Sequence, residues 1–323
     1  MIVSFITVLL NERENLPNAY QQVLEFNDHI PGIDWEYILV DDGSTDGSWE
    51  YISALSKKDA RVKGIRFTRN FGAISAVMAG LNIATGEYIF DMAADGQEPI
   101  ELFAQLLQSN LDNGYEISWA VRISRKDSFL SKFFSKMYYK IIRTFAISNF
   151  PAEGLDAFCI NRRIANFLLE NYESTSNMHN LTYWAGFPYG KVYYDRQKRT
   201  KGKSKWTFGK KFNLFINSFL SFTYAPLRFV TILGLIFFLI GLIWGGYIIL
   251  YAFIYGFKIE GFASIMALIL LGFGITNLSI GIISEYIWRN FEIAKKKPLY
   301  IIREKTFAEI NTATPLPVST RSL

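Results

Sequence analysis

Two long stretches without a charged residue dominate the carboxyl-terminal third of this 323-residue chain. Phe229–Phe257 runs for 29 residues and Gly261–Ser284 for 24, with three residues between them. A helix needs about 20 apolar residues to cross the hydrocarbon core of a bilayer, so each stretch is long enough to span it. A core helix of a soluble domain rarely runs so far without a charge. The sequence therefore predicts a hairpin of two transmembrane helices, over 227–257 and 261–284.

Basic residues flank both stretches. Ten basic residues and one acidic residue lie between Lys191 and Arg228. Between the second stretch and residue 305 lie six more basic residues, at Arg289, Lys295, Lys296, Lys297, Arg303 and Lys305. The positive-inside rule places both flanks, the amino-terminal two thirds of the chain and both termini in the cytoplasm. The aromatic-rich segment 206–226 is predicted to be an interfacial helix, and the tail 285–323 to be cytoplasmic with a disordered end.

The amino-terminal part alternates between strand-like and helix-like segments. Strands are predicted over Ile2–Leu10, Trp35–Val40, Val62–Phe67, Glu87–Asp91 and Glu116–Val121. Helices are predicted over Asn15–Asp28, Gly47–Lys57, Ala73–Ala84 and Pro99–Asn113. This alternation is typical of an α/β domain with a mostly parallel sheet. We place the domain at 1–205, including an amphipathic segment over 129–147 that can lie against the bilayer or pack on the sheet.

Three polar clusters follow predicted strands. They are Leu10, Asn11 and Glu12 after the first strand, Asp41 and Asp42 after the second, and the run from Asp91 to Glu98 after the fourth. Ligands of open parallel sheets bind beyond the carboxyl ends of the strands, so these clusters predict a site at one edge. Taken alone, the run from Asp41 to Ser48 is equally well explained by an Asx turn and a helix N-cap. The three clusters together favour the functional interpretation.

Several classes of site lack their sequence motif. The chain has no G-x-G-x-x-G after a strand and no G-x-x-x-x-G-K-[ST], which argues against Rossmann dehydrogenases and P-loop enzymes. Two histidines and one cysteine make a His/Cys zinc cluster implausible and leave no internal disulfide. The phosphates of any nucleotide must therefore be bound by a divalent cation and basic side chains.

Taken in order, the motifs resemble those of glycosyltransferase family 2, and within it the polyprenyl-phosphate glycosyltransferases, which include dolichyl-phosphate mannose synthase and the bacterial bactoprenol glucosyltransferases. The motifs are Leu9–Glu12, Val40–Ser44, Thr68–Gly72 leading to Ala79–Leu81, Ala94–Pro99, Trp184–Phe187, and Arg199 with Gly202–Trp206. The resemblance extends to about residue 305. It implies a GT-A fold, a nucleotide-sugar donor, Mg²⁺ or Mn²⁺, and a lipid phosphate acceptor.

The resemblance also implies roles for individual residues. The implied nucleotide-binding residues are Leu10, Asn11, Glu12, Asp41, Asp42 and Ala94. Asp95 matches the second aspartate of the family's D-x-D metal motif, whose first position is Ala93 here, and Gln97 and Asp91 are further candidate metal ligands. A divalent cation takes several hard oxygen ligands, including phosphate and water. The loss of one carboxylate therefore weakens the site without abolishing it.

Asp156 and Asp95 are the catalytic candidates, because Asp156 matches an acidic position that the family places near the reacting centre. The alternative for Asp156 is an N-cap of a helix over Asn161–Asn171. A phosphate monoester is already an anionic nucleophile, so Asp156 would orient a substrate or take a remaining proton. The residues predicted to bind the acceptor phosphate are Arg122, Arg125, Arg196, Arg199, Ser204 and Lys205. A solvated basic face attracted to anionic headgroups is the alternative for some of them.

The expected activity is the inverting transfer of one sugar, glucose from UDP-glucose by resemblance, to undecaprenyl or another polyprenyl phosphate. The expected place is the cytoplasmic face of the bacterial inner membrane, with the product used for O-antigen or other envelope glycan modification after a separate flippase. A homotetramer is implied by resemblance, and no nucleic acid is expected. Two alternatives stay open. A processive polysaccharide synthase would need more spans and a Q-x-x-R-W motif, and a catalytically silent nucleotide-sugar-binding membrane partner is supported by Ala93.

Overall fold

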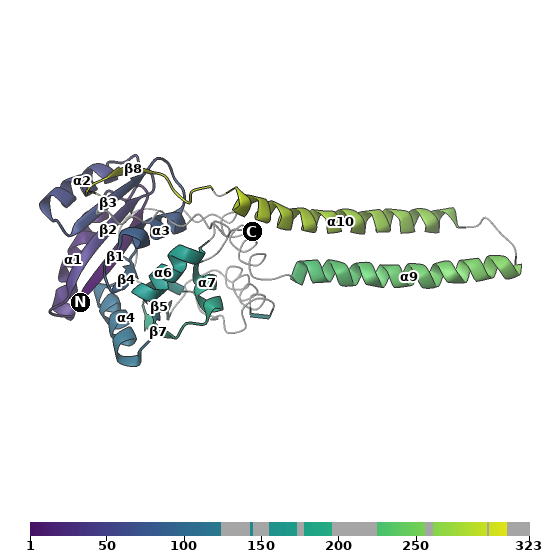
Figure 1. Cartoon of the computed structure of the whole chain (residues 1–323), viewed down its shortest axis with the longest axis horizontal. Helices are drawn as coiled ribbons and strands as arrows, with labels where there is room; N and C mark the ends of the chain where they lie inside the picture. The colour runs from purple at the N-terminus through teal and green to yellow at the C-terminus, as the bar shows by residue number, and fades with distance from the viewer. Residues whose placement is uncertain are drawn as a thin grey trace, which may run out of the picture.

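The computed structural model describes residues 1–123, 143–144, 155–172, 178–195, 225–255, 261–295 and 297–308. These residues form an α/β domain and a hairpin of two long helices that extends away from it (Figure 1). The amino terminus lies on the side of the domain away from the hairpin (Figure 1). Three predicted segments lie outside the described residues: 129–147 except for 143–144, the interfacial segment as far as residue 224, and the end of the tail.

The described strands form one mixed sheet in the order β7-β5-β6-β4-β1-β2-β3-β8. Their bounds are β1 Ile2–Leu9, β2 Asp34–Asp41, β3 Val62–Phe67, β4 Tyr88–Asp91, β5 Ile117–Arg122, β6 Leu155–Asn161, β7 Tyr189–Tyr194 and β8 Ile302–Lys305. The pairs β1–β2, β1–β4, β2–β3 and β5–β7 are parallel, whereas β6 and β8 run antiparallel to their neighbours. The predicted mostly parallel sheet is confirmed.

The central strands are apolar along most of their length because helices cover both faces of the sheet. The helices are α1 Leu16–His29, α2 Ser48–Lys58, α3 Ala73–Ile83, α4 Ile100–Asn113, α6 Arg162–Asn171 and α7 Met178–Ala185. Helices α1, α2 and α4 pack on one face, where Phe5 stacks on Phe90 at 4.7 Å and meets the edge of Phe26 at 5.0 Å. Helices α3, α6 and α7 pack on the other face around Trp119 and Phe158. Packing on both faces holds the sheet rigid, including the edge at which its parallel strands end.

Helices α9 (Ala225–Tyr255) and α10 (Phe262–Ala294) run side by side and contact each other (Figure 1). Within the described residues, the 21-residue stretch Leu227–Tyr247 has the length and composition of a membrane span. Helix α10 continues through Ala294, ten residues past the end of the predicted second span. After this extension the chain returns to the α/β domain, where β8 pairs with β3 at the edge of the sheet.

Candidate active site

The first two polar clusters meet at the carboxyl ends of β1 and β2. The side-chain carbonyl of Asn11 accepts a hydrogen bond from the Thr45 amide at 2.8 Å, and the Asn11 amide donates to the Ser44 hydroxyl at 2.8 Å. Asp41 accepts a hydrogen bond from the Ser44 amide at 2.7 Å through Oδ1. Asn11 has a φ of 53°, a backbone conformation that asparagine tolerates better than most residues. These contacts join the loop after β1 to the turn after β2, as the sequence predicts.

Asp42 connects this turn to the motif that follows β3. Its Oδ1 accepts a hydrogen bond from the Phe71 amide at 2.7 Å, and its Oδ2 accepts one from the Gly72 amide at 3.0 Å. Gly43 has a φ of +84°, and a Cβ added there would lie 2.8 Å from the carbonyl carbon of Arg69. Both carboxylate oxygens of Asp42 are therefore used to hold the loop that contains Arg69 and Phe71. Its role in binding a nucleotide stays a prediction.

Asp41 is fully buried, and burial raises the pKa values of both Asp41 and Asp42. The Oδ2 atom of Asp41 accepts no hydrogen bond from the described residues. The Arg66 Nε atom lies 3.7 Å from it, and Arg66 Nη2 donates to the Ser44 carbonyl at 3.2 Å. Arg66 lies at the end of β3 and was not among the predicted site residues. Its pairing with Asp41 depends on the β2–β3 register, which the sequence alone does not reveal.

The third cluster places several carboxylates together after β4. Burial raises the pKa of Asp91 to about 7. Burial, reinforced by the charges of Asp91, Asp156 and Asp95, raises the pKa of Glu98 to about 8. Asp95 is also buried, and its Oδ1 accepts a hydrogen bond from the Gln97 amide at 3.2 Å. Glu98 was not a predicted site residue, although it belongs to the Ala94–Pro99 motif, and its Oε2 accepts a hydrogen bond from the amide of Ala93 at 2.9 Å.

This cluster can be compared with the requirements of a divalent cation. Within the described residues, no group of three or more His, Cys, Asp or Glu side chains is arranged to hold a metal ion. A cage made only by the protein therefore does not fit. Asp95, with Gln97 beside it, fits a cation that takes its remaining oxygen ligands from a diphosphate and water. The neighbouring carboxylates, which add to the effect of burial in raising the pKa of Glu98, also favour a positive charge at this place.

Asp156 lies near the start of β6, next to the end of β5, and β7 lies on the other side of β5. Arg122 donates to both carboxylate oxygens of Asp156 through Nε and Nη2, and the Tyr194 hydroxyl donates to Oδ2 at 2.8 Å. The N-cap alternative for Asp156 is wrong, because Asn161 caps α6 by accepting a hydrogen bond from the Ile164 amide at 3.0 Å. Asp156 is held by side chains of two neighbouring strands, at the same edge of the sheet as the other clusters.

Of the residues predicted to bind the acceptor phosphate, one lies within the described part of the chain. Arg122 ends β5 and pairs with Asp156. The other predicted residues, Arg125, Arg196, Arg199, Ser204 and Lys205, lie outside the described residues.

Among the nucleotide-binding candidates, Ala94 is buried, and Leu10 and Glu12 follow β1 beside Asn11. His179 stacks on Trp119 at 4.9 Å, and burial lowers its pKa to about 4.

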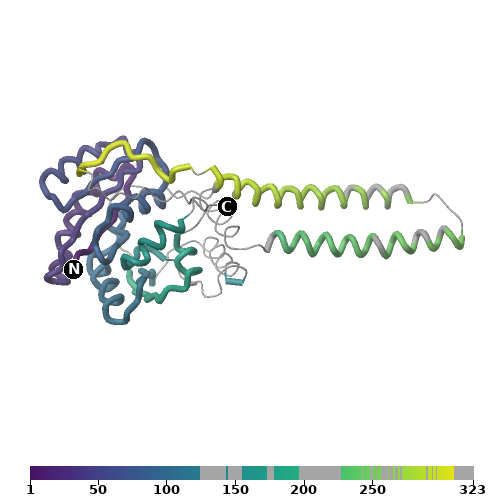
Figure 2. Tube along the Cα trace, viewed as in Figure 1, coloured from purple at the N-terminus to yellow at the C-terminus, as the bar shows by residue number. Residues whose placement is uncertain are grey.

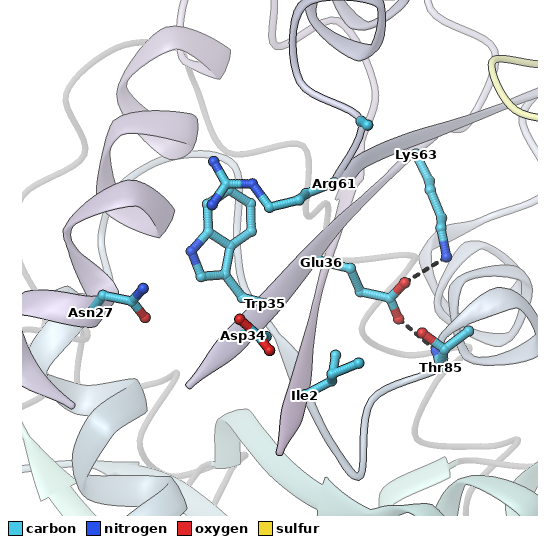
Figure 3. Close-up of a pocket in the computed structure, with 9 residues that line it drawn as sticks. Ile2, Asn27, Asp34, Trp35, Glu36, Arg61, Lys63 and Thr85 are labelled. Atoms are coloured by element: carbon cyan, nitrogen blue, oxygen red, sulfur yellow. Dashed lines mark hydrogen bonds and ion pairs between the residues drawn. The ribbon is translucent and has the colours of Figure 1, made fainter. Parts of the chain in front are cut away.

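A separate hollow of about 350 Å³ lies at the opposite edge of the sheet, where β1 and β2 begin. Figure 3 shows the Arg61 guanidinium over the ring of Trp35, at 3.7 Å from the ring centroid, and Glu36 between Lys63 and Thr85. Lys63 Nζ lies 2.6 Å from Glu36 Oε2, so the buried carboxylate is paired. Because these charges neutralise one another, we interpret the hollow as part of the structural framework.

We expect Lys63→Met to lower the free energy of unfolding by about 3 kcal/mol, because it leaves Glu36 buried without its cation. Burial raises the pKa of Glu36, but hydrogen bonds from Lys63, Ser4 and Thr85 outweigh it, and the net pKa is lowered. The wild-type protein should therefore keep this stabilisation above about pH 4.5 and lose it as the pH falls through the lowered pKa. In the variant, the buried carboxylate without its cation should take up a proton more readily, so the stability deficit relative to the wild type should be largest near pH 8 and should shrink as the pH falls. Thermal unfolding followed from pH 4 to 8, with the exposed Lys57→Met as control, measures both effects, and equal stability of the two variants would contradict the expectation.

The chain is similar to known proteins over most of its length. The family model described as glycosyl transferase family 2 matches residues 4–229, and the model described as the GtrB C-terminal hairpin matches residues 225–289. An uncharacterized glycosyltransferase of Synechocystis sp. is 31% identical over 94% of this chain and 95% of its own length. The bactoprenol glucosyl transferase of Shigella phage SfV is 30% identical over 94% of this chain and 99% of its own length. A solved mannosyltransferase from Pyrobaculum calidifontis, in complex with GDP-Man and Mn²⁺, is 16% identical with a TM-score of 0.45, over 62% of this chain and 58% of that one.

The two family models meet where the described α/β domain gives way to the hairpin. The first covers the sheet from β1 to β7 together with the polar clusters at its edge, and the second covers α9 and most of α10. The hairpin match and the apolar length of α9 indicate association with a membrane. The expected GT-A class of α/β domain is confirmed. The chain is a glycosyltransferase that belongs to glycosyltransferase family 2 and has a GtrB-type C-terminal hairpin.

Proposed function

We propose that the enzyme transfers one sugar, with inversion, from a nucleotide sugar to a polyprenyl phosphate at the cytoplasmic face of the bacterial inner membrane. UDP-glucose is the proposed donor and undecaprenyl phosphate the proposed acceptor. One observation carries the proposal: the similarity to a bactoprenol glucosyl transferase extends over 94% of this chain and 99% of that protein, through both the α/β domain and the hairpin.

The arrangement of the clusters supports this activity. The loop after β1 and the turn after β2 would receive the nucleoside, with Asn11 and Asp41 as the first contacts. The acidic cluster after β4 would lie beside the diphosphate. A divalent cation held by Asp95, with Gln97 and Asp91 as further candidates, would neutralise the charge that develops on the leaving diphosphate. In chain order α9 of the hairpin is the next described element after β7, and an acceptor anchored in the bilayer would approach from the end of β7.

The reaction needs little proton transfer. An oxygen of the acceptor phosphate attacks the anomeric carbon, the bond from that carbon to the diphosphate breaks, and the electron pair leaves with the nucleoside diphosphate. Because the nucleophile is already anionic, positioning and charge neutralisation supply most of the catalysis. Asp156, held by Arg122 and Tyr194, would orient the sugar or the acceptor. Arg122 would also take part in binding the acceptor phosphate.

The product would be a polyprenyl-phosphate sugar on the cytoplasmic side. Two membrane spans enclose no path for a sugar, so a separate flippase would carry the product across the membrane. Its sugar would then modify O-antigen or another envelope glycan. Membrane spans that associate through their helices also offer a route to the proposed homotetramer.

We expect the purified full chain to transfer label from radioactive UDP-glucose to undecaprenyl phosphate in a chloroform-extractable form, one sugar per lipid. Because the developing charge on the diphosphate needs a cation, EDTA should stop the transfer, and Mg²⁺ or Mn²⁺ should restore it. The assay uses a panel of nucleotide sugars, and the anomeric configuration of the product is read by NMR. A label that grows into a polymer would support a processive synthase. Nucleotide-sugar binding without transfer would support a silent partner, and activity in EDTA would overturn the cation.

A further inference from the structure

The strand that follows the membrane hairpin is part of the α/β sheet. After α10 the chain returns to the amino-terminal domain, and Figure 2 shows the yellow carboxyl-terminal segment running along the purple and blue part of the tube. There β8 pairs antiparallel with β3. The Gly64 amide donates to the Thr306 hydroxyl at 2.8 Å, and the ring of Tyr300 stacks on Phe67 at 5.1 Å. The carboxyl end of the hairpin is thus fixed to the strand that lies beside β2.

This pairing creates a row of alternating charges across three strands. Asp41 of β2 is the register partner of Arg66 of β3, and Arg66 is the register partner of Glu304 of β8. Arg66 Nε lies 3.7 Å from Asp41 Oδ2, and Arg66 Nη1 lies 3.2 Å from Glu304 Oε1. The other oxygen of Glu304 accepts a hydrogen bond from the indole of Trp49 on α2 at 2.9 Å. One cation therefore lies between two carboxylates, and the outer carboxylate is fixed by a buried indole.

Arg66 contacts both ends of the turn after β2. It faces the buried carboxylate of Asp41 and donates to the carbonyl of Ser44, whose amide is in turn bonded to Asp41. An arginine side chain has many rotamers, and fixing one of them costs entropy. Glu304 lowers that cost because it holds the far side of the guanidinium with a charge-assisted hydrogen bond. The Arg66 side chain is only 17% exposed and that of Asp41 is buried, so little solvent screens this contact, whereas Glu304 is 42% exposed and acts on Arg66 from the solvent side.

We infer that Glu304 is a positioning residue for the donor site, acting through Arg66 on the turn from Asp41 to Ser44. The strand after the membrane hairpin would then help to shape the nucleotide pocket, and anchoring the hairpin and binding the donor would be structurally connected. This inference rests on the proposed function in one respect, namely that the turn contacts the nucleoside of the donor.

The test is the binding of UDP to the full chain in detergent, measured by calorimetry. We expect Glu304→Gln to weaken UDP binding about three- to tenfold, because Arg66 loses the outer of its two charged partners while the shape of the Glu304 side chain is kept. Arg66→Gln should weaken binding more, and the double variant should bind like Arg66→Gln alone, since the two residues act in one row. Asp112→Asn, which removes an exposed carboxylate from α4, is the matched control and should bind like the wild type.

Kinetics separate positioning from a general loss of structure. With UDP-glucose and undecaprenyl phosphate, Glu304→Gln should raise the KM for the donor by the same factor and leave kcat and the acceptor KM unchanged. Glu304→Asp, which keeps the charge, should recover part of the affinity. A measurement on the wild type does not depend on any variant folding: UDP should slow amide hydrogen exchange in residues 302–305.

Wild-type affinity for UDP in Glu304→Gln, additive losses in the double variant, or unchanged exchange in 302–305 would each overturn the inference. These results would leave the proposed function intact, provided that the wild type transfers sugar. If the wild type transfers no sugar to lipid but binds UDP, and the Glu304 and Arg66 variants weaken that binding, the proposed function is wrong and the positioning role stands. If the wild type binds none of UDP, GDP and dTDP, both are overturned.

Discussion

Replacing Asp95 by alanine should lower kcat/KM for sugar transfer about 10²- to 10³-fold while leaving the protein folded. The loss in rate is expected because Asp95 is the carboxylate that we propose to share a cation with the leaving diphosphate, and such charge neutralisation is worth several kcal/mol. The fold should survive because Asp95 belongs to a crowded acidic cluster. Burial raises the pKa of Glu98 to about 8 and the charge of Asp95 adds to this effect, so removing that charge relieves repulsion.

Transfer of label to lipid and thermal unfolding, measured on the same preparation, test this prediction. Glu101→Ala is the matched control, since Glu101 lies in the first turn of α4 and its side chain is 57% exposed. It should keep the wild-type rate. Ala93→Asp supplies a second carboxylate and should lower the Mg²⁺ or Mn²⁺ concentration needed for half-maximal rate. Wild-type transfer by Asp95→Ala would show that Asp95 does not serve the reaction.

The order of the amino-terminal elements was predictable because their patterns are local. The strands at the centre of the sheet are buried on both faces and read as apolar runs, and β2 is buried at every position after its first. The segment Ile302–Lys305 gives no such signal, since three of its four residues are charged. It becomes β8 through its contact with β3, which lies about 240 residues earlier in the chain. A pattern read within one segment cannot show such a pairing.

The candidate active site was likewise predictable where its residues follow a local pattern, and not where they depend on pairing between distant strands. Asn11 and Asp41 follow predicted strands directly and Asp95 follows one within four residues, and a parallel sheet brings such positions to one edge. The partners of these residues were missed where they come from another strand. Arg66 reaches Asp41 through the β2–β3 register, and Tyr194 of β7 reaches Asp156 of β6 across β5. Arg122 was predicted only as a ligand of the acceptor phosphate, because the antiparallel pairing of β5 and β6 that brings it to Asp156 joins segments more than 30 residues apart.

Asp156→Asn should lower kcat about 10²- to 10³-fold, because it removes the charge that holds Arg122 while keeping the size of the side chain. The structure shows both carboxylate oxygens in use, with Arg122 on each and Tyr194 on one. An amide offers only one acceptor to these donors, so the guanidinium would turn away from its present position. Tyr194→Phe removes a single hydrogen bond and should cost at most about tenfold. Single-turnover transfer to undecaprenyl phosphate measures both effects on the chemical step.

The size of the loss does not by itself distinguish orientation from proton transfer, but chemical rescue does. If Asp156 orients the substrates together with Arg122, formate or azide should not restore the Asn variant, because a small base cannot rebuild a two-point contact with a guanidinium. If Asp156 removes a remaining proton from the acceptor phosphate, an added base should raise the rate with its concentration. We expect no rescue. Such a rise would contradict the orienting role, whereas a loss in Tyr194→Phe that adds nothing to the loss in Asp156→Asn would show that Tyr194 acts through Asp156.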